Sequence, residues 1–497
     1  MAKKVLSKSK LMAFRQCPRR LWLEVHRPEL REDSAASQSR FDDGHRVGEI
    51  ARSIYDPQSK GVLLDIQALG LDGAVARTKV LLGARAPIFE AGFAARQVRA
   101  FADVLLPVRR RGRAAWRMVE VKSSTSVKDY HRDDVATQAL LAQEAGVDLA
   151  EVAVALIDSS WVYRGRGDYS GLLVEADLTQ EALDRGKEVK EWIKEAHAVV
   201  EKPAEPEVRT GRHCSSPYDC GFHGYCSARE PQAKVPAAWL PRVQTKALRS
   251  LLDSGGALEM VDVPESLLND RQRRVRDVTL SGKAYLDRAG ARRALAADSS
   301  PTYFLDFETV MFAVPRWKGT RPYQQIPFQF SVHRYSRSGS LEHVSHLDLS
   351  GEDPSRGFAE ALAVACGKRG PIYVYNVGFE RSRIIELAER FPALCGPLEA
   401  IIRRLRDLLP VVMDHYYHPS QRGSWSIKSV LPTIAPDLSY ADLDGVQDGG
   451  MAMAAYLEGT SPSTPPARKA DINRSLLSYC GMDTEGLFRI WSFLNAR

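Results

Sequence analysis

Short runs of apolar and aromatic residues, each about the length of one strand, alternate along the chain with segments of helical periodicity. Residues 303–305 form one such run and residues 372–375 form another, so both are predicted to be buried strands. Near the C-terminus, Leu487, Ile490 and Leu494 recur at helical spacing, which predicts an amphipathic helix. Strands that alternate with helices predict an α/β fold.

A β-hairpin is predicted in the N-terminal part of the chain. Residues 98–106 and 116–123 have strand patterns, and an arginine-rich turn separates them. Because side chains alternate along a strand, Glu120 and Lys122 share one face, and Asp103 can approach them from the neighbouring strand. Two carboxylates could hold a divalent ion there, while the ammonium group orients water and offsets charge on a phosphate.

Carboxylates are expected to meet at one place in the C-terminal third. Asp306 and Glu308 are two residues apart on a strand and therefore project to the same side. Tyr479 and Asp483 lie one turn apart on one face of the C-terminal helix, and Glu380 sits where the second strand gives way to a helix. Magnesium and manganese prefer several oxygen ligands, and in-line phosphodiester cleavage uses two such ions about 3.5 to 4 Å apart. The pattern therefore predicts a site for Mg²⁺ or Mn²⁺.

These motifs, with Asn-x-x-Phe directly before Glu380, resemble the DEDD exonucleases of the RNase H-like superfamily, in the branch whose third motif is Tyr-x-x-x-Asp. The resemblance implies 3′ to 5′ removal of nucleotides, with Asp306 bridging two ions and Tyr479 positioning the nucleophile. That family usually has Asp where this chain has Glu380, and Asp414 is an alternative ligand. The short Asp-Phe-Glu motif alone would also fit solvated acids at a strand end.

Three cysteines recur with five residues between neighbours, at Cys214, Cys220 and Cys226. Three thiolates leave one corner of a tetrahedral or cubane site open, and Cys17 is the expected remote partner. An iron-sulfur cluster, a zinc ion bound with help from nearby histidines, and free buried thiols are the alternatives. Seven cysteines in a chain of 497 residues do not predict a disulfide framework.

The segment Cys-Pro-Arg-Arg-Leu-Trp that begins at Cys17, together with the three later cysteines, resembles the RecB-like nucleases that carry an iron-sulfur cluster. Members of that group act in CRISPR adaptation and in helicase-nuclease repair enzymes. The resemblance implies a 4Fe-4S cluster held by these four cysteines. It also implies that the catalytic core lies between them.

The predicted hairpin, with Asp followed by Glu-x-Lys, resembles the PD-(D/E)XK motif of those nucleases. Gln138 resembles the glutamine that begins their next helix motif, although Ala142 stands where Tyr is usual. The family also implies an upstream helical metal ligand, for which His45 and Glu49 are candidates because they share a helix face. Glu90 is a further acidic candidate, with a solvated acid as its simpler interpretation.

Composition favours a polyanionic partner without requiring one. Lysine and arginine total 69 against 62 aspartates and glutamates, for a net charge of +7 and a pI of about 8.9. No apolar run reaches the length of a membrane-spanning helix, and the basic first residues are not followed by a signal-peptide core. A cytoplasmic protein is expected.

Three domains are expected on these grounds. Residues 1–230 would form a PD-(D/E)XK restriction-endonuclease-like domain with an iron-sulfur cluster, and residues 297–497 an RNase H-like DEDD exonuclease domain. Residues 231–296 would be a small helical linker, either a solvated connector or a DNA-binding insert. The insert would use a basic group made of Arg271, Arg273, Arg274 and Arg276.

The chain as a whole resembles bacterial proteins that fuse a RecB-like iron-sulfur nuclease to a DEDD-type exonuclease. The resemblance implies a metal-dependent nuclease that acts on DNA ends or single strands, in repair or in defence against foreign DNA. Two alternatives stay open. One is a cluster-stabilised nucleic-acid-binding scaffold with one or both sites inactive, and the other is an exonuclease directed at RNA.

Overall fold

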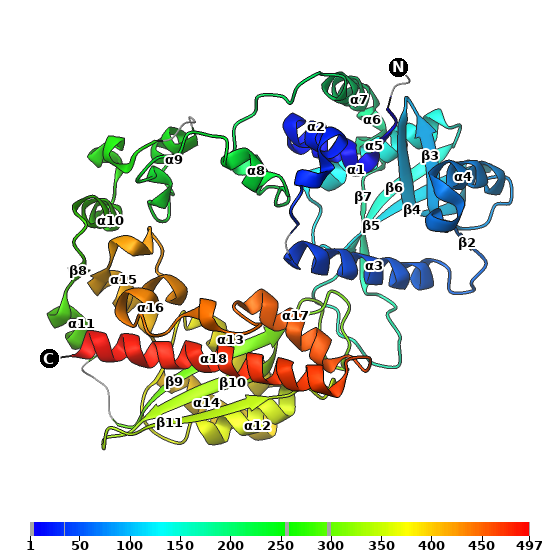
Figure 1. Ribbon diagram of the computed structural model, residues 1–497. Coiled ribbons are helices and arrows are strands. Elements are labelled where there is room, and N and C mark those ends of the chain that lie inside the picture. Colours follow the sequence, from blue (N-terminus) through cyan, green and yellow to red (C-terminus); the bar gives the residue numbers. More distant parts are fainter. Residues whose placement is uncertain (1–3, 34, 254–257, 296–299, 497) are drawn as a thin grey trace. The chain divides into compact units, whose positions relative to one another are not determined.

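The computed structural model describes residues 4–33, 35–253, 258–295 and 300–496 (Figure 1). The fold is mixed α/β, and the chain divides into two compact units. The first unit comprises Met1–Glu230 and Phe312–Gln324, and the second comprises Pro231–Met311 and Gln325–Arg497. Residues 231–296 therefore belong to the second unit, and a short segment from the C-terminal half of the chain belongs to the first.

A seven-stranded mixed sheet forms the centre of the first unit. Its strands run in the order β2-β3-β4-β5-β6-β7, and β1 pairs in parallel with β4. β4 and β5 form the predicted hairpin, closed by a two-residue turn at Arg111 and Gly112, which both have positive φ. The strands are β1 (Leu6–Ser7), β2 (Val62–Leu63), β3 (Ile88–Ala95), β4 (Val98–Arg110), β5 (Arg113–Lys122), β6 (Leu149–Ile157) and β7 (Leu173–Asp177).

Helices cover both faces of this sheet. On one face α5 packs across β3, β4 and β6 and is itself contacted by α1, α6 and α7. On the other face α3 contacts β4 and β5. The helices are α1 (Lys8–Gln16), α2 (Pro18–His26), α3 (Ala35–Tyr55), α4 (Ile66–Leu81), α5 (Asp129–Glu144), α6 (Thr179–Asp184), α7 (Gly186–Val200) and α8 (His223–Ser227).

The second unit contains a five-stranded sheet in the order β11-β10-β9-β12-β13. β9 pairs antiparallel with β10 and parallel with β12, which in turn pairs parallel with β13. The strand order thus reverses at β9, and open sheets of this kind bind ligands beyond the carboxyl ends of their strands at such a point. The strands are β9 (Thr302–Val310), β10 (Ile326–Tyr335), β11 (Leu341–Leu347), β12 (Ile372–Val374) and β13 (Leu405–Asp407), and a separate pair is formed by β8 (Tyr285–Leu286) and β14 (Tyr416–Tyr417).

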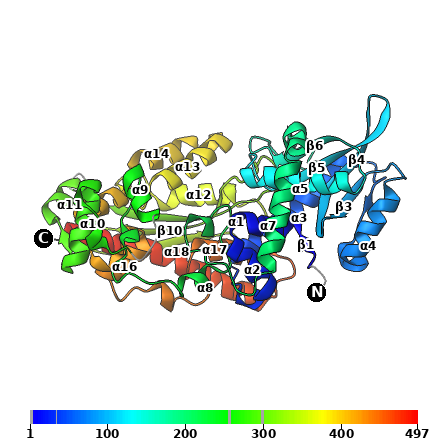
Figure 2. The same ribbon diagram turned by 90° about the horizontal axis from the view of Figure 1, so that it is seen from above.

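Two helical layers enclose this second sheet, as Figures 1 and 2 show. α12, α13 and α14 pack on the face that carries Leu305 and Phe307 of β9. The long α18 lies on the opposite face, where Phe488 and Trp491 contact the ring of Phe304. The helices are α9 (Lys246–Asp253), α10 (Asp270–Ser281), α11 (Arg288–Leu295), α12 (Ser355–Ala365), α13 (Gly378–Arg390), α14 (Cys395–Arg404), α15 (Leu408–His415), α16 (Ile427–Ile434), α17 (Gly449–Thr460) and α18 (Pro466–Asn495).

The basic group of α10 takes part in contacts within the second unit. Arg271 forms an ion pair with Asp414 at 2.7 Å, and Arg274 donates to the Asp414 carbonyl and stacks on Tyr285. Arg273 donates to the Leu268 carbonyl at 2.5 Å. These contacts anchor α10 to its neighbours.

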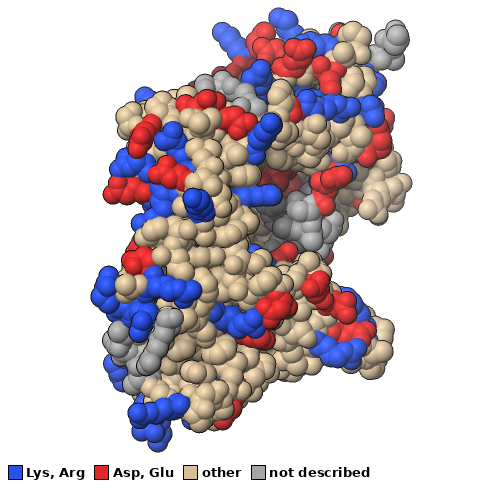
Figure 3. Space-filling model, turned by 60° about the vertical axis from the view of Figure 1, so that its left-hand side comes forward, with Lys and Arg blue, Asp and Glu red and all other residues tan. Residues whose placement is uncertain are grey.

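Positive and negative side chains are interspersed on the face shown in Figure 3. None of the helices in the described ranges combines the length and the apolar character that crossing a bilayer requires.

Candidate metal centres

Three carboxylates meet beside β9 of the second unit. Ligand atoms of Asp306, Glu308 and Asp483 all lie within 4.8 Å of one another. Asp306 and Glu308 project from β9 toward α18, which carries Asp483, because Phe304 on the same strand face packs against α18. The strand alternation and the helical spacing in the sequence therefore placed these three residues correctly.

Glu380 is a fourth carboxylate close to this trio. It occupies the first turn of α13, its side chain is buried, and its Oε2 has no hydrogen-bond partner in the described part of the chain. Its charge contributes to raising the pKa of Asp306. The turn before it is held by Asp407, whose carboxylate accepts the amides of Asn376 at 3.0 Å and Val377 at 3.1 Å.

Asp407 was not a sequence candidate, whereas Asp414 was. The structure places Asp414 in its ion pair with Arg271, with more than half of its side chain exposed, and it is not a member of the carboxylate trio. Asp407 also caps α15 by accepting the amide of Leu409. It serves the turn that positions Glu380 rather than the trio directly.

Two further residues that the sequence did not indicate lie beside Asp483. The hydroxyl of Tyr440 donates to Asp483 Oδ1 at 2.5 Å. The ammonium of Lys428 lies 5.2 Å from the ring centre of Tyr440 and 5.3 Å from that of Tyr479, and it donates to the Gln447 carbonyl. The predicted Tyr479 thus lies next to the carboxylates, and the ammonium of Lys428 lies near the rings of both Tyr479 and Tyr440.

The pKa values of all four acids of this site are raised. Burial and then the charges of Asp483, Glu308 and Glu380 raise the pKa of Asp306 well above its usual value. Burial raises the pKa of Glu308 to about 8, of Glu380 to about 8 and of Asp483 to about 6, with repulsion from Asp483 adding to the effect at Glu308. A divalent cation would relieve both the burial cost and the repulsion.

We expect the metal-free protein to lose stability as the pH rises from about 4 to about 8. The raised pKa values of Glu308 and Glu380 mean that the folded state binds more protons than the unfolded state in this interval. Their stabilising contribution is complete below the unfolded value of about 4.3 and is lost as the pH rises through the folded value. Mg²⁺ or Mn²⁺ should reverse that loss.

The measurement is the melting temperature in EDTA and in Mn²⁺, at about pH 5 and about pH 8.5. The metal-induced increase should be larger at the higher pH and should shrink in Glu308→Gln. An equal increase at both pH values would contradict the prediction.

The predicted residues of the first unit also converge. Asp103 of β4 lies opposite Glu120 of β5, since Val104 pairs with Val119. Lys122 Nζ lies 2.6 Å from Glu120 Oε1, and Asp103 Oδ2 accepts the amide of Val121 at 2.6 Å. Burial, followed by repulsion from Glu120, raises the pKa of Asp103 well above its usual value.

Gln138 lies in this group, and so do Asp134 and Lys8, which were not candidates in the sequence. The side-chain amide of Gln138 donates to Glu120 Oε2 at 2.6 Å. Asp134, one helical turn earlier on α5, pairs with Lys122 at 2.5 Å and with Lys8 at 2.8 Å. The i, i+4 spacing to Gln138 was a signal for Asp134, whereas a lysine close to the N-terminus carries no distinctive pattern.

The candidate helical ligands have different surroundings. Glu49 is exposed and pairs with Arg46 at 2.9 Å. His45 is also exposed, although it acts electrostatically on Glu90. Glu90 is half-buried on β3 next to the register position of Asp103, and its φ of +57° is a strained value for a non-glycine strand residue. Burial and repulsion from Glu120 raise the pKa of Glu90. Glu90 therefore lies within electrostatic range of the group around Glu120, whereas the carboxylate of Glu49 is engaged in an exposed ion pair with Arg46.

All four predicted cysteines line one small cavity of the first unit. Cys17 lies at the N-terminus of α2 and the other three lie between residues 214 and 226. Gln16 docks the two segments by donating to the carbonyls of His213 at 2.6 Å and Tyr218 at 2.7 Å. The cavity residues include Cys17, Cys214, Cys220, Cys226, His213 and His223.

The spacing of these thiols tests which group would fit. Tetrahedral zinc, with Zn–S bonds of about 2.3 Å, would hold its sulfurs about 3.8 Å apart. In the described ranges, no three cysteine or histidine ligand atoms lie within 4.8 Å of one another. The thiols as placed are therefore not arranged as the ligands of one tetrahedral zinc ion.

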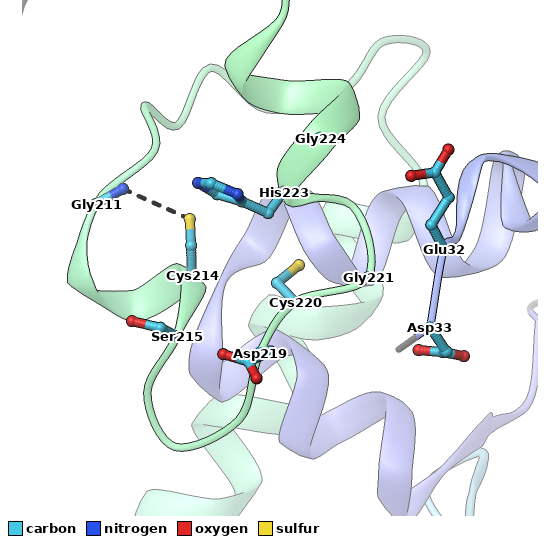
Figure 4. A pocket seen from close by; sticks show the side chains of 10 residues that line it. All are labelled: Glu32, Asp33, Gly211, Cys214, Ser215, Asp219, Cys220, Gly221, His223 and Gly224. Carbon is cyan, nitrogen blue, oxygen red and sulfur yellow. Dashed lines mark hydrogen bonds between the residues drawn. The ribbon is translucent and has the colours of Figure 1, made fainter. Parts of the chain in front are cut away.

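Backbone amides lie near the thiols, but burial disfavours their negative form. The amide of Gly211 donates to Cys214 Sγ at 3.5 Å, and backbone amides also act on Cys17 and Cys220. Burial raises the pKa of Cys17 and Cys220, and that of Cys226 to about 11, so deprotonation needs a cation. Figure 4 shows Cys214 and Cys220 also facing an adjoining open cavity of about 480 Å³, with the carboxylates of Glu32, Asp33 and Asp219 around it.

The comparisons with known proteins give one match. The model of a family described as a domain of unknown function, DUF2779, matches residues 303–426. None of the curated proteins matches the chain. The matched segment begins on β9 and contains Asp306, Glu308 and Glu380, but it ends before Lys428 and Asp483. This part of the chain, with three of the four carboxylates, is thus similar to a family whose description names no activity.

Proposed function

We propose that this protein is a metal-dependent nuclease that hydrolyses phosphodiester bonds of DNA, with one catalytic centre in each unit. The observation that carries the proposal is the trio of Asp306, Glu308 and Asp483, whose ligand atoms lie within 4.8 Å of one another in a buried site. Their position beside the strand at which the sheet order reverses also supports a ligand site there.

In the second unit, four carboxylates would hold a pair of Mg²⁺ or Mn²⁺ ions. Such a pair activates water and stabilises the leaving oxygen of a phosphodiester. Tyr479 is placed to position the attacking water, and Tyr440 fixes the orientation of Asp483 through its 2.5 Å hydrogen bond. Lys428 would add positive charge beside the carboxylates, where it could offset charge on a bound phosphate. The four carboxylates that would hold the ions belong to Asp306, Glu308, Glu380 and Asp483.

In the first unit, Asp103 and Glu120 would hold a divalent ion of the same kind. Gln138 orients Glu120 by donating to its Oε2. Lys122, paired with Glu120 at 2.6 Å, is placed to orient water and to offset charge on the phosphate during attack. The residues thus provide the acid, acid and lysine combination that the sequence predicted.

We further propose that Cys17, Cys214, Cys220 and Cys226 hold a 4Fe-4S cluster, which is supported by their shared cavity and wide spacing. The cluster would tie α2 to a segment almost 200 residues later in the chain. Its role would be structural, since it links both ends of the first unit.

DNA ends or single strands are the proposed substrates, within cytoplasmic repair or defence against foreign DNA. The net charge of +7 favours a polyanion. Metal and phosphate contacts do not sense the 2′-hydroxyl of RNA, so RNA belongs in the same assay.

The experiment is cleavage of 5′- and 3′-labelled single- and double-stranded DNA and RNA by the anaerobically purified full chain, with Mg²⁺ or Mn²⁺. Asp306→Asn and Lys122→Met should each remove one product pattern, and the double variant should remove both while DNA binding persists. Unchanged cleavage by the double variant would overturn the proposal. Tight binding without cleavage by the wild-type protein would instead show a nucleic-acid-binding scaffold.

A further inference from the structure

Lys8 makes the same contacts as Lys122 in the centre of the first unit. Its Nζ lies 2.9 Å from Glu120 Oε1 and 2.8 Å from Asp134 Oδ1. Lys122 Nζ lies 2.6 Å from Glu120 Oε1 and 2.5 Å from Asp134 Oδ2. Two ammonium groups and two carboxylates therefore form a closed ring of four charges.

The backbone holds Lys8 in this place. Leu6 donates its amide to the Gln97 carbonyl at 2.9 Å and pairs with Val98 of β4. Ser7 caps α1, so that Lys8 is the first residue of the helix, and only 18% of its side chain is exposed. The backbone therefore positions Lys8 within the centre, where most of its side chain is shielded from solvent.

The charges of the two centres differ. In the first unit, Lys8 and Lys122 each pair with both Glu120 and Asp134, while Asp103 and Glu90 act electrostatically on the same group without an ion pair of their own in the described ranges. In the second unit, the four acids form no ion pair with lysine or arginine within the described ranges. The first centre thus has ammonium groups paired directly with its carboxylates, whereas in the second centre Lys428 acts on Glu308 and Asp483 without forming an ion pair with them.

We propose that Lys8 supplies the positive charge that a second divalent ion would otherwise supply, so that the first unit takes one divalent ion, held by Asp103 and Glu120. Lys8 is then a positioning residue, which keeps Glu120 and Asp134 in place without a second ion. The inference rests on the proposed function of this centre as a metal site. It makes the two centres different in kind, with one ion in the first unit and two in the second.

The test counts Mn²⁺ ions bound by the full chain, by electron paramagnetic resonance of the free ion. Asp306→Asn combined with Asp483→Asn silences the centre of the second unit, and this background should bind one Mn²⁺ per chain. Adding Lys8→Met, which keeps the length of the side chain and removes its charge, should raise the number to two. Lys8→Arg should restore one.

Lys10→Met is the matched control, because Lys10 lies on the same helix and forms no ion pair in the part of the chain that the structure describes. It should leave one bound ion. Circular dichroism and melting curves show whether each variant is folded, and Lys8→Gln replaces Lys8→Met if the latter is not. Two ions bound before Lys8 is changed, or no increase in a folded Lys8 variant, would overturn the inference.

The same series separates this inference from the proposed nuclease activity. If the number of bound Mn²⁺ ions rises from one to two in Lys8→Met and no cleavage is seen, the role of Lys8 is supported and the nuclease activity is not. Cleavage that is lost in Lys122→Met, with a constant ion count in the Lys8 variants, would support the nuclease and overturn the role of Lys8. No Mn²⁺ bound by the background variant would overturn both for this centre.

Discussion

Asp306→Asn should slow cleavage by the centre of the second unit about a thousandfold or more. Asp306 is the acid on which all three others act, since Asp483, Glu308 and Glu380 each raise its pKa. If the proposed ions bind, Asp306 is therefore the acid whose charge they would relieve most. Metal-ion stabilisation of the transition state is worth several kcal/mol, and each loss of about 1.4 kcal/mol lowers the rate tenfold.

The rate is measured in single turnover as release of the 3′-terminal nucleotide, in a Lys122→Met background that silences the other centre. Asp414→Asn is the matched control, because its carboxylate pairs with Arg271 and is exposed. The control should keep its rate, and both variants should bind labelled DNA with similar affinity. A rate for Asp306→Asn within tenfold of the control would show that the four acids do not form a catalytic centre.

The periods of strands and helices in the sequence predicted those features of the fold and of the sites that depend on the geometry of one strand or one helix. Strand alternation placed Asp306 and Glu308 on the face that meets α18, and helical spacing placed Asp483 there. The predicted hairpin is present as β4 and β5, with Asp103 opposite Glu120. In each case the side-chain direction follows from one local backbone geometry.

Residues that reach a site from a separate element could not be predicted in the same way. Tyr440 follows a loop and Lys428 lies in a short helix, and neither position is linked to Asp483 by any period along the chain. Lys8 depends on the parallel pairing of a two-residue strand with β4. Such contacts depend on tertiary packing, which a pattern within one segment of the sequence does not reveal.

The assignment of the segment Phe312–Gln324 to the first unit also depends on tertiary packing and could not be predicted from a local pattern. The segment leaves the second sheet between β9 and β10 and belongs to the first unit, where the Thr320 carbonyl accepts the amide of Tyr163 at 3.0 Å. Ala313 and Val314 pack into an apolar cluster there. Its prolines and glycine resemble those of any loop, so its assignment to the first unit could not be predicted from the sequence.

If the four cysteines hold the proposed 4Fe-4S cluster, Cys17→Ser should remove the brown colour expected of the anaerobically purified protein and should destabilise the first unit. Cys17 is the proposed ligand that lies far from the other three cysteines in the sequence, at the start of α2. Without it the segment with the other three cysteines would be held to α2 by its remaining contacts, among them the hydrogen bonds of Gln16 and the packing of Phe222 against Leu23. Binding energy of a metal group is folding energy when the unfolded chain lacks the site.

A loss of roughly 4 kcal/mol would lower the melting temperature of a unit of this size by roughly 10 °C. The measurements are the iron content, the visible absorption and the melting curve of each variant. Cys226→Ser should behave as Cys17→Ser does, because both thiols are buried in the same cavity. Cys395→Ser is the matched control, since Cys395 lies at the start of α14 in the second unit and contacts Glu399.

The control should keep both the colour and the melting temperature. Colour retained in Cys17→Ser would show that another residue completes the site, and His213 or His223, which line the same cavity, would be the next to change. Colourless wild-type protein that contains zinc would overturn the cluster itself, and the thiols would then have to move closer together than the structure places them.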